Sequence, residues 1–423
     1  MSDLKCVPES KTARSVAEPE LRFPEFNDSL QRVKLGLLTT KISDGIHSTP
    51  IYDEQGDYFF VNGNNLINGR IAIDEKTKRV NEAEFQKHQR ELHNNTILLS
   101  INGTIGNMAF FRGEKIVLGK SACYINVDPE KSEKRFVSNY IQTTHVRKFF
   151  NGQLTGSTIK NLSLYTVKSL PVFIPKIEEQ QKIADFLSSV DQKIEQLTEK
   201  HRLLTDYKKG VMQQLFTQQT RFKDDQGNDY PEWGFVKLNS VTSLITKGTT
   251  PTSIGHIFQV EGINFIKAES LANHRVDNSK TAKISAKCDD AMKRSRLMEN
   301  DIVFSIAGTL GRTAIITSND LPANTNQAIA IIRLADKRHV PFIHLSLNLS
   351  EISKYIRQVL SVGAQPNLNL QQVGEIKIKL PCIEEQQKIA DFLTAIDQKI
   401  QQTQTTLNQT QAFKKGLLQK MFV

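Results

Sequence analysis

The chain has 423 residues, about three times the length of an ordinary domain, so we expect at least two separate hydrophobic cores. Hydrophobic residues make up 39% of the chain and charged residues 24%, which is typical of globular proteins. No apolar run approaches the roughly 20 residues that cross a bilayer, which excludes a membrane protein and predicts a cytoplasmic one. With 55 Lys and Arg against 45 Asp and Glu, the net charge of +10 points to an anionic partner.

Residues 1–20 are a polar stretch that contains acidic residues and no continuous apolar segment. They resemble neither a secretory signal nor a transit peptide, and we expect a disordered N-terminal tail. Residues 21–176 are predicted to form an α+β domain, with β-like runs at 96–101 and 116–118 and a helical stretch at 136–151. Loops rich in Gly, Ser, Thr, Asn and Gln lie at 43–50, 102–107 and 152–161. Such side chains hydrogen-bond base edges and phosphates, but they also simply make turns, and both interpretations stay open.

Residues 177–218 carry apolar side chains at alternating spacings of four and three, which predicts a long helix with a heptad seam. Pro175 lies just before this segment, and Glu178 and Glu179 suit the positive end of the helix dipole. A helix of about 40 residues is roughly 60 Å long, too long to be one face of a small domain. We therefore expect a spacer helix.

The second half of the chain repeats this plan. A polar linker, residues 219–229, leads to a second predicted α+β domain, residues 230–382, and a second long helix, residues 383–423. The segments IEEQQKIADFLSSVDQKIEQ (177–196) and IEEQQKIADFLTAIDQKIQQ (383–402) share 16 of 20 residues at an offset of 206. A fainter echo pairs SINGTIG (100–106) with SIAGTLG (305–311). The expected fold is thus a pseudo-two-fold repeat whose two long helices pair as an antiparallel coiled coil.

The second domain shows the same kinds of element as the first. Its predicted β-like runs are 301–306 and 329–334, its helical stretch is 340–360, and its polar loops are 246–253, 307–313, 323–327 and 363–369. The positive charge also follows the domains, with a net +5 on residues 1–176 and +6 on residues 230–382, whereas the helical segments carry −1 and +1. This distribution favours two nucleic-acid-binding domains joined by helices that carry almost no net charge.

Polar positions outside the seam recur unchanged in the two helical segments, although a coiled coil constrains them weakly. Two equivalent partner-binding surfaces would explain this, and a purely structural role for the helices is the alternative. The predicted partner-binding residues are Gln180, Gln181, Lys182, Asp185, Gln192 and Lys193, with Gln386, Gln387, Lys388, Asp391, Gln398 and Lys399.

Catalytic motifs are missing from the sequence. GEKIVLGKS (113–121) has five residues between its glycines, where a phosphate-binding loop requires four. Glu375 and Lys377 have the spacing of a metal-dependent nuclease, but they sit in a β-like run without an acidic pair nearby. His47 and His201 are explained by a loop and a polar seam position, so we predict no metal site and no catalytic residue.

Two divergent domains, each followed by a nearly identical helix that opens IEEQQKIADFL and carries KKG near its end, strongly resemble the specificity (S) subunit of type I restriction-modification enzymes. The resemblance implies two target recognition domains that read the halves of a bipartite sequence in double-stranded DNA, with the helices setting the gap. It also implies two methyltransferase (M) subunits docked on this chain and restriction (R) subunits in the full complex. Those partners would hold S-adenosylmethionine, ATP and Mg²⁺, and this chain would hold no cofactor.

Loop position and side-chain chemistry select the candidate DNA-binding residues. They are His47, Ser48, Thr49, Asn102, Thr104, Lys120 and Thr158 in the first half, and Lys247, Thr249, Thr250, Thr309, Arg312, Asn326, Gln327 and Gln365 in the second. Two other functions are carried as alternatives: a coiled-coil scaffold without sequence-specific DNA binding, and an autonomous nuclease that uses Glu375 and Lys377.

Overall fold

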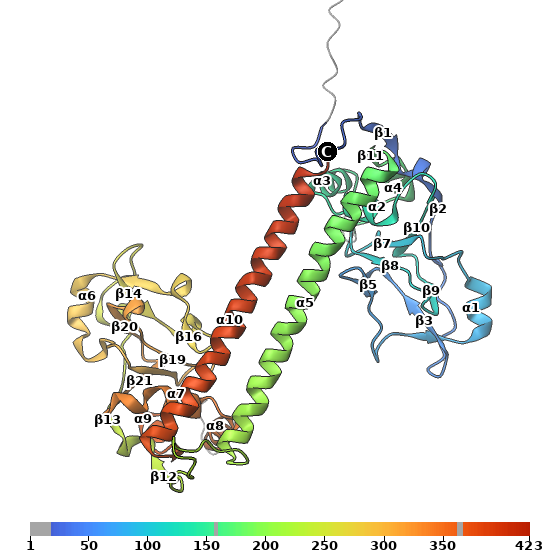
Figure 1. Cartoon of the computed structure of the whole chain (residues 1–423). Coiled ribbons are helices and arrows are strands. Elements are labelled where there is room, and N and C mark those ends of the chain that lie inside the picture. Colours follow the sequence, from blue (N-terminus) through green and yellow to red (C-terminus); the bar gives the residue numbers. More distant parts are fainter. Residues whose placement is uncertain (1–17, 156–159, 362–366) are drawn as a thin grey trace, which may run out of the picture. The chain divides into compact units, whose positions relative to one another are not determined.

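The computed structural model describes residues 18–155, 160–361 and 367–423 (Figure 1). Most of the expected tail, residues 1–20, therefore lies outside the described residues. The chain divides into two compact units, Met1–His201 with Thr403–Val423, and Arg202–Gln402. Each unit combines one globular domain with part of each long helix, because both long helices begin in one unit and end in the other. The domain boundaries given above stay a prediction.

The first unit is an α+β structure. Its strands are β1 (Gln31–Lys34), β2 (Thr39–Asp44), β3 (Tyr58–Val61), β4 (Leu66–Ile67), β5 (Arg70–Ile71), β6 (Arg79–Val80), β7 (Thr96–Ser100), β8 (Met108–Phe110), β9 (Ile116–Leu118), β10 (Ala122–Val127) and β11 (Pro171–Ile174). Its helices are α1 (Glu82–His88), α2 (Lys134–Ile141), α3 (Thr144–Gly152), α4 (Leu164–Ser169) and the first part of α5 (Ile177–Phe216).

A four-stranded antiparallel sheet, in the order β2-β10-β7-β8, is the centre of this unit. Strands β7 and β10 are buried along their whole length, because helices cover one face and the small sheet β6-β3-β9 lies at the other. In that small sheet β3 runs parallel to β9. Strand β1 pairs with β11, so the first and last strands of the domain meet directly before α5.

The second unit has the same topology. Its strands are β12 (Gly234–Lys237), β13 (Thr242–Lys247), β14 (Ile263–Ile266), β15 (Leu271–Ala272), β16 (Arg275–Val276), β17 (Ala282–Ile284), β18 (Ile302–Ser305), β19 (Thr313–Ile315), β20 (Ala323–Thr325), β21 (Ile329–Leu334) and β22 (Lys377–Leu380). Its helices are α6 (Ala286–Ala291), α7 (Val340–Leu347), α8 (Ser350–Ser361), α9 (Leu370–Gly374) and the first part of α10 (Ile383–Lys420). The sheet orders β13-β21-β18-β19, β17-β14-β20 and β12-β22 repeat those of the first unit.

The predicted strands at 96–101, 116–118, 301–306 and 329–334 are confirmed to within one residue at each end. Glu375 was expected in a β-like run but is the C-cap residue of α9, because β22 begins at Lys377. The two expected helical stretches are each divided. Residues 136–151 belong to α2 and α3, because the Thr143 side chain accepts a hydrogen bond from Val146 N and starts a new helix. Residues 340–360 likewise belong to α7 and α8, which meet at Asn348, the C-cap residue of α7. The helical character of both stretches is confirmed, and each is divided into two helices.

Two lysines that interrupt the apolar seam form ion pairs between the long helices. In the second unit the Lys208 ammonium lies 2.6 Å from Asp397 of α10, and in the first unit Lys414 lies 2.6 Å from Asp191 of α5. The two pairs are related by the offset of 206 that relates the helical segments in sequence. Each charged seam position therefore has an acidic partner on the other helix.

At the start of each long helix a buried glutamate binds an arginine that lies near the beginning of the preceding domain. Arg22 donates two hydrogen bonds of 2.7 Å to Glu179, and Arg221 donates to Glu385 at 3.1 and 2.8 Å. Trp233 Nε1 also donates to Glu385, at 2.9 Å. Arg221 lies in the expected linker 219–229, so this segment is not merely a connection but is bonded to the second unit.

The end of each long helix completes the core of one domain. Phe422 is 4% exposed and contacts the rings of Phe136 and Tyr140 in the first unit. Phe216, at the position equivalent to Phe422, contacts Phe342, the counterpart of Phe136, and also Trp233 in the second. Because aromatic residues bury a large apolar area, these ends contribute strongly to the stability of each unit.

We predict that Phe422→Ala lowers the free energy of unfolding of the first unit by about 3–5 kcal/mol, because it leaves a cavity between α2 and α10. Phe413→Ala is the matched control nine residues earlier, on α10; because Phe413 is 55% exposed, it should change stability by no more than about 0.5 kcal/mol. Urea unfolding followed by circular dichroism measures both. Equal effects of the two substitutions would show that the Phe422 contacts are not formed.

Candidate nucleic-acid interface

Polar loops that are distant in sequence meet at one end of the strands of the four-stranded sheet in the first unit. We call this end of the sheet the loop edge. Strands β2 and β7 end at this edge and the antiparallel strand β10 begins there. Ile46 N donates to Leu118 O at 2.7 Å, and Ile101 N donates to Ser121 O at 3.0 Å. The loops 43–50, 102–107 and 118–121 are therefore held against each other by backbone hydrogen bonds.

The structure brings Asn102, Thr104 and Lys120 together at this edge. Asn102 Nδ2 donates to Lys120 O at 3.4 Å, and the Thr104 hydroxyl lies 3.3 Å from the Ser100 hydroxyl. Thr104 and Lys120 are exposed and Asn102 is half-buried. His47, Ser48 and Thr49 are exposed on the neighbouring loop, where His47 Nε2 lies 2.9 Å from Asp44 Oδ2. Thr158 lies outside the described residues.

The turn after β7 depends on two glycines in a left-handed conformation. Gly103 has φ +71° and Gly106 φ +91°, and their counterparts Gly308 and Gly311 have φ +72° and +78°. Only glycine adopts such values without strain, which explains why the SINGTIG and SIAGTLG echoes survive between otherwise divergent domains. The turn presents Thr104 in one domain and Thr309 in the other, and both side chains are exposed.

The second unit forms the same edge with different side chains. Gly248 N donates to Asn326 O at 3.1 Å, and Ile306 N donates to Ala328 O at 2.8 Å. The Thr250 hydroxyl hydrogen-bonds the Gln327 side chain across the two loops. Lys247, Thr309, Arg312 and Gln327 are exposed, whereas Thr249, Thr250 and Asn326 are half-buried. Gln365 lies outside the described residues.

Hydrogen bonds to the protein restrain both the backbone and the side chain of Arg312. Its backbone N donates to Ser305 Oγ at 2.8 Å, and its guanidinium donates to Leu271 O at 3.3 Å. The side chain remains exposed, so its other donors can contact an anion.

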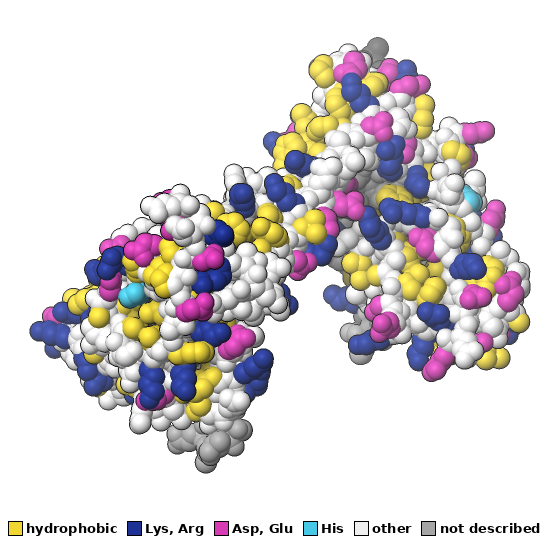
Figure 2. Space-filling view, turned by 60° about the horizontal axis from the view of Figure 1, so that its bottom comes forward, with side chains coloured by type: hydrophobic (Ala, Val, Ile, Leu, Met, Phe, Trp, Pro, Cys, Tyr) yellow, Lys and Arg dark blue, Asp and Glu magenta, His cyan; other side chains and the backbone are white. Residues whose placement is uncertain are grey.

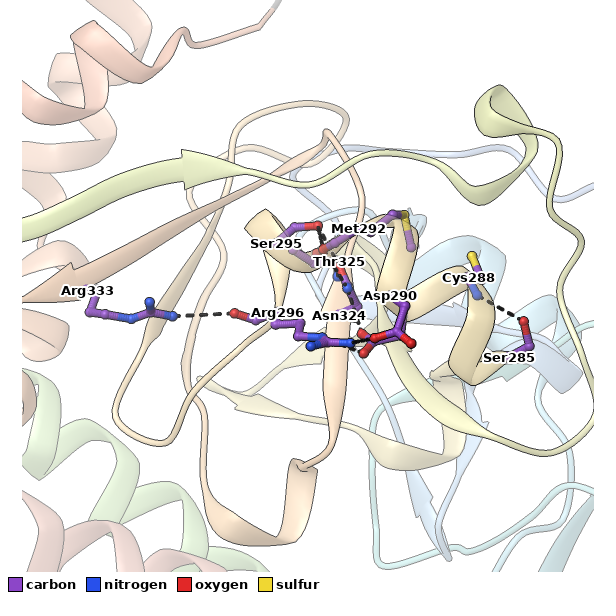
Figure 3. A network of polar contacts seen from close by, with 10 residues as sticks. Ser285, Cys288, Asp290, Met292, Ser295, Arg296, Asn324, Thr325 and Arg333 are labelled. Atoms are coloured by element: carbon purple, nitrogen blue, oxygen red, sulfur yellow. Dashed lines mark hydrogen bonds and ion pairs between the residues drawn. The ribbon is translucent and has the colours of Figure 1, made fainter.

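A buried polar network supports the loop 323–327 from behind (Figure 3). The Asn324 amide donates to Asp289 at 2.8 Å and accepts from Ser295 Oγ at 2.6 Å. Arg296 joins the network through Asp289, at 2.6 Å, and Asp290. Because every bond of Asn324 lies inside the domain, the neighbouring Asn326 and Gln327 are presented on a rigid support. Residue chemistry alone pointed to Asn326 and Gln327 and missed this support.

Figure 2 shows how charged side chains are distributed on one face of the molecule. On the face that Figure 2 shows, Lys and Arg are scattered among Asp and Glu.

The predicted partner-binding residues on the helices separate into two classes. Gln180 and Gln386 were expected to be exposed, but each is 1% exposed, which corrects that expectation. Gln180 accepts from the Ser132 hydroxyl at 2.8 Å, and Gln386 lies 2.8 Å from His339 Nδ1, because the globular domain packs on this face of the helix. Lys388 is half-buried, and the rest are exposed: Gln181, Lys182, Asp185, Gln192, Lys193, Gln387, Asp391, Gln398 and Lys399.

Within the described residues, no three His, Cys, Asp or Glu side chains are grouped as metal ligands. None of the helices in the described part of the chain is long and apolar enough to span a membrane.

A buried histidine lies behind the turn that carries Arg312. His344 Nε2 is 3.1 Å from the Thr313 hydroxyl, which itself donates to Asn348 at 2.8 Å. Because the Thr313 hydroxyl donates to Asn348, its oxygen accepts from His344 Nε2. Burial, together with the nearby His274 and Lys208, lowers the pKa of His344 to about 3.

Comparison with known proteins is consistent with this duplicated architecture. A family model described as type I restriction modification DNA specificity domain matches residues 31–205 and again residues 230–411. The specificity subunit of the type I restriction enzyme EcoBI from Escherichia coli is 26% identical over 304 residues, which cover 67% of this chain and 63% of that protein. The match thus spans slightly less than two thirds of that relative.

Two further relatives extend the comparison. The specificity subunit of the type I restriction enzyme MjaVIII from Methanocaldococcus jannaschii is 24% identical over 337 residues, 77% of this chain and 78% of that protein. The crystal structure of a type I restriction-modification S subunit from M. genitalium has a TM-score of 0.61 at 18% identity, covering 96% of this chain and 99% of that one. This likeness shows the fold, so the predicted pair of similar α+β domains is confirmed.

We predict that the second unit loses stability as the pH falls below 6.5. The pKa of His344 is lower in the folded chain than in the unfolded chain, so the unfolded state binds more protons in this range. The stabilisation is complete above the unfolded pKa of about 6.5 and is lost as the pH falls toward 3, at up to about 1.4 kcal/mol per pH unit. Urea unfolding at several pH values should show a shallower dependence for His344→Gln between pH 6 and pH 4; an unchanged slope would contradict the prediction.

Proposed function

The chain belongs to the type I restriction-modification DNA specificity family, and we propose that it is the non-catalytic subunit that selects the DNA sequence on which such a system acts. Each globular domain reads one half of a bipartite target in double-stranded DNA. Membership of this family favours this function over a coiled-coil scaffold without sequence-specific DNA binding. It likewise gives no support to a nuclease that uses Glu375 and Lys377.

One observation carries the proposal: two domains of identical topology present the same loop edge with different side chains. Lys120 in the first domain corresponds to Gln327 in the second. Lys120 follows Gly119, whose carbonyl accepts from Ala122 N, and Gln327 follows Asn326, whose carbonyl accepts from Ile329 N. Polar side chains on rigid loops are suited to hydrogen-bond base edges, and different half-sites require different side chains. A shared scaffold with divergent loops is therefore what two readers of unlike half-sites need.

The long helices are proposed to pair as an antiparallel coiled coil that sets the gap between the half-sites. The ion pairs Lys208–Asp397 and Lys414–Asp191 support this pairing, since each couples α5 to α10 inside one unit. Supercoiled helices of fixed length would act as a ruler between the readers.

The near-identity of the two helices supports docking of two methyltransferase subunits on equivalent surfaces. In this proposal restriction subunits join the full complex, and S-adenosylmethionine, ATP and Mg²⁺ are bound by those partners and not by this chain. The exposed polar residues of the helices, such as Gln181 and Gln387, remain the predicted docking positions.

Exchange of one domain tests the division of labour. Replacing residues 21–176 with the corresponding domain of another specificity subunit should change one half-site of the methylated sequence and leave the other half-site and the gap unchanged. Mapping methylated adenines in a genome that carries the chain and its methyltransferase subunit measures the outcome. Methylation that is unaffected by the exchange would exclude the reading function of this domain.

Loop-edge cations should contribute to the affinity for DNA through the phosphates. We expect Lys247→Ala or Lys120→Ala, in the complex with the methyltransferase subunit, to weaken duplex binding and to lower the slope of log K against log salt by about 1. Lys377→Ala is the control, because Lys377 is an exposed lysine on β22, away from the loop edge. Fluorescence anisotropy at several salt concentrations distinguishes them, and an equal loss for the control would contradict the prediction.

A further inference from the structure

An exposed aliphatic residue followed by an aromatic one occurs at the same place in both domains. Ile51 and Ile257 are 69% and 74% exposed, and Tyr52 and Phe258, which follow them, are 43% and 38% exposed. We call Ile51–Tyr52 and Ile257–Phe258 the Ile–aromatic pairs. The segments IYDEQG (51–56) and IFQVEG (257–262) stand at an offset of 206, the offset of the long helices.

Equivalent hydrogen bonds hold the two pairs. Directly after the first pair, Asp53 N donates to Arg79 O at 2.9 Å; directly after the second, Gln259 N donates to Lys283 O at 2.9 Å. Arg79 pairs with Phe59 of β3, and Lys283 pairs with Asn264 of β14, so the acceptors occupy matching positions in the small sheets.

A glycine closes each segment for the same steric reason. A Cβ on Gly56 would lie 2.2 Å from Val80 O, and a Cβ on Gly262 would lie 2.3 Å from Ile284 O. Neither position accommodates a side chain. The two loops are thus copies of one structure, and the agreement at these residues is not accidental similarity of exposed surface.

The aromatic member of each pair is fixed by neighbouring rings and a lysine. Tyr52 lies 5.8 Å from the ring of Phe60, and Phe258 lies 5.5 Å from that of Phe265. The ammonium of Lys78 is 5.6 Å from the Tyr52 ring centre, and that of Lys267 is 5.0 Å from the Phe258 ring centre. These contacts orient the pair, and the isoleucine side chain stays in solvent.

The retention of the pairs contrasts with the divergence of the adjacent reading loops. The loop before the first pair reads SDGIHSTP (43–50), and its counterpart reads TKGTTPTS (246–253). Side chains that read different half-sites must differ between the domains, whereas side chains that meet the same partner twice can stay alike. Exposed Ile and aromatic side chains next to a rigid loop are typical anchors of protein interfaces.

The charges beside the pairs disfavour DNA as the ligand of this surface. Asp53, Glu54 and Asp57 follow the first pair, and Glu261 follows the second. Carboxylates repel the phosphate backbone, while Lys78 and Lys267 are already engaged with the rings of the pairs. A protein surface with an apolar pocket fits this chemistry better than a polyanion does.

We propose that the Ile–aromatic pairs are two equivalent docking points for two copies of one protein, the methyltransferase subunit of the same system, each received in an apolar pocket of that subunit. This inference rests on the proposed function and adds to it a contact on each globular domain, separate from the helices.

The test compares binding of the purified methyltransferase subunit to the full chain and to three variants. Two variants each change one pair, Ile51→Ser with Tyr52→Ser, and Ile257→Ser with Phe258→Ser. The third, Met298→Ser, is the matched control, because Met298 is 54% exposed in the second domain but corresponds to no apolar residue in the first. Mass photometry and titration calorimetry count the bound copies and measure their affinity, and thermal unfolding verifies that each variant folds.

Each paired variant should weaken one of the two binding events by about tenfold or more and leave the other intact, with Met298→Ser unchanged. Unchanged binding in both paired variants would overturn the inference. Normal subunit binding with weaker duplex binding would also overturn it and would identify the pairs as DNA contacts. If the unsubstituted chain binds no methyltransferase subunit, the proposed function itself fails, so the two failures are distinguishable. Should a paired variant fail to fold, Ile51→Ser or Ile257→Ser alone is used, since each isoleucine is largely exposed.

Discussion

The arginine–carboxylate pair at the start of each long helix is the interaction on which the rest of the structure depends. Glu179 and Glu385 are almost fully buried, and each is paired with an arginine: Arg22 at the start of the first domain, and Arg221 in the segment just before the second. A buried carboxylate without such a partner would be strongly destabilising. The pair therefore joins the beginning of a domain to the helix that leaves it, and the first and last strands of the domain meet beside it.

On this common frame the two domains support their loops by different chemistry. In the first domain Val117 and Phe85 pack in an apolar cluster behind the loop edge. In the second domain the matching positions on β20 and α6 are Asn324 and Asp289, which hydrogen-bond each other. Apolar packing and a fully bonded polar network both give a rigid support. A backbone of one topology can thus present loops of unlike chemistry without a change of strand order.

Much of the architecture could be predicted from the sequence because the duplication is strong where side chains meet a constant environment. The start of each long helix, at Ile177 and Ile383, and the buried strands followed from helix-terminus signals and apolar runs. The burial of Gln180 and Gln386 did not, since heptad spacing describes one face of a helix and carries no information about a domain that packs on another. The role of Arg221 was hidden in a polar segment for the same reason: its partner Glu385 is 164 residues away.

Only part of the candidate site could be predicted from the sequence. Loop composition pointed to residues such as Asn102 and Lys120, but their convergence depends on strand pairing between β7 and β10, which no local pattern encodes. The Ile–aromatic pairs did leave a signal, a shared isoleucine and glycine at the offset of the helices, yet two matching residues are too few to stand out before the loops are seen to coincide.

The route of the long helices has a consequence for biosynthesis. The core of the first unit contains Leu187 and Val190 of α5 together with Leu417 of α10 and Phe422, which follows α10, and the ribosome adds these last two more than 200 residues later. Domains usually fold as they emerge, N-terminal part first. Here the apolar face of the domain that is translated first stays open until the final turns of α10 arrive, so the nascent chain is exposed to aggregation and to chaperone capture throughout the synthesis of residues 202–402.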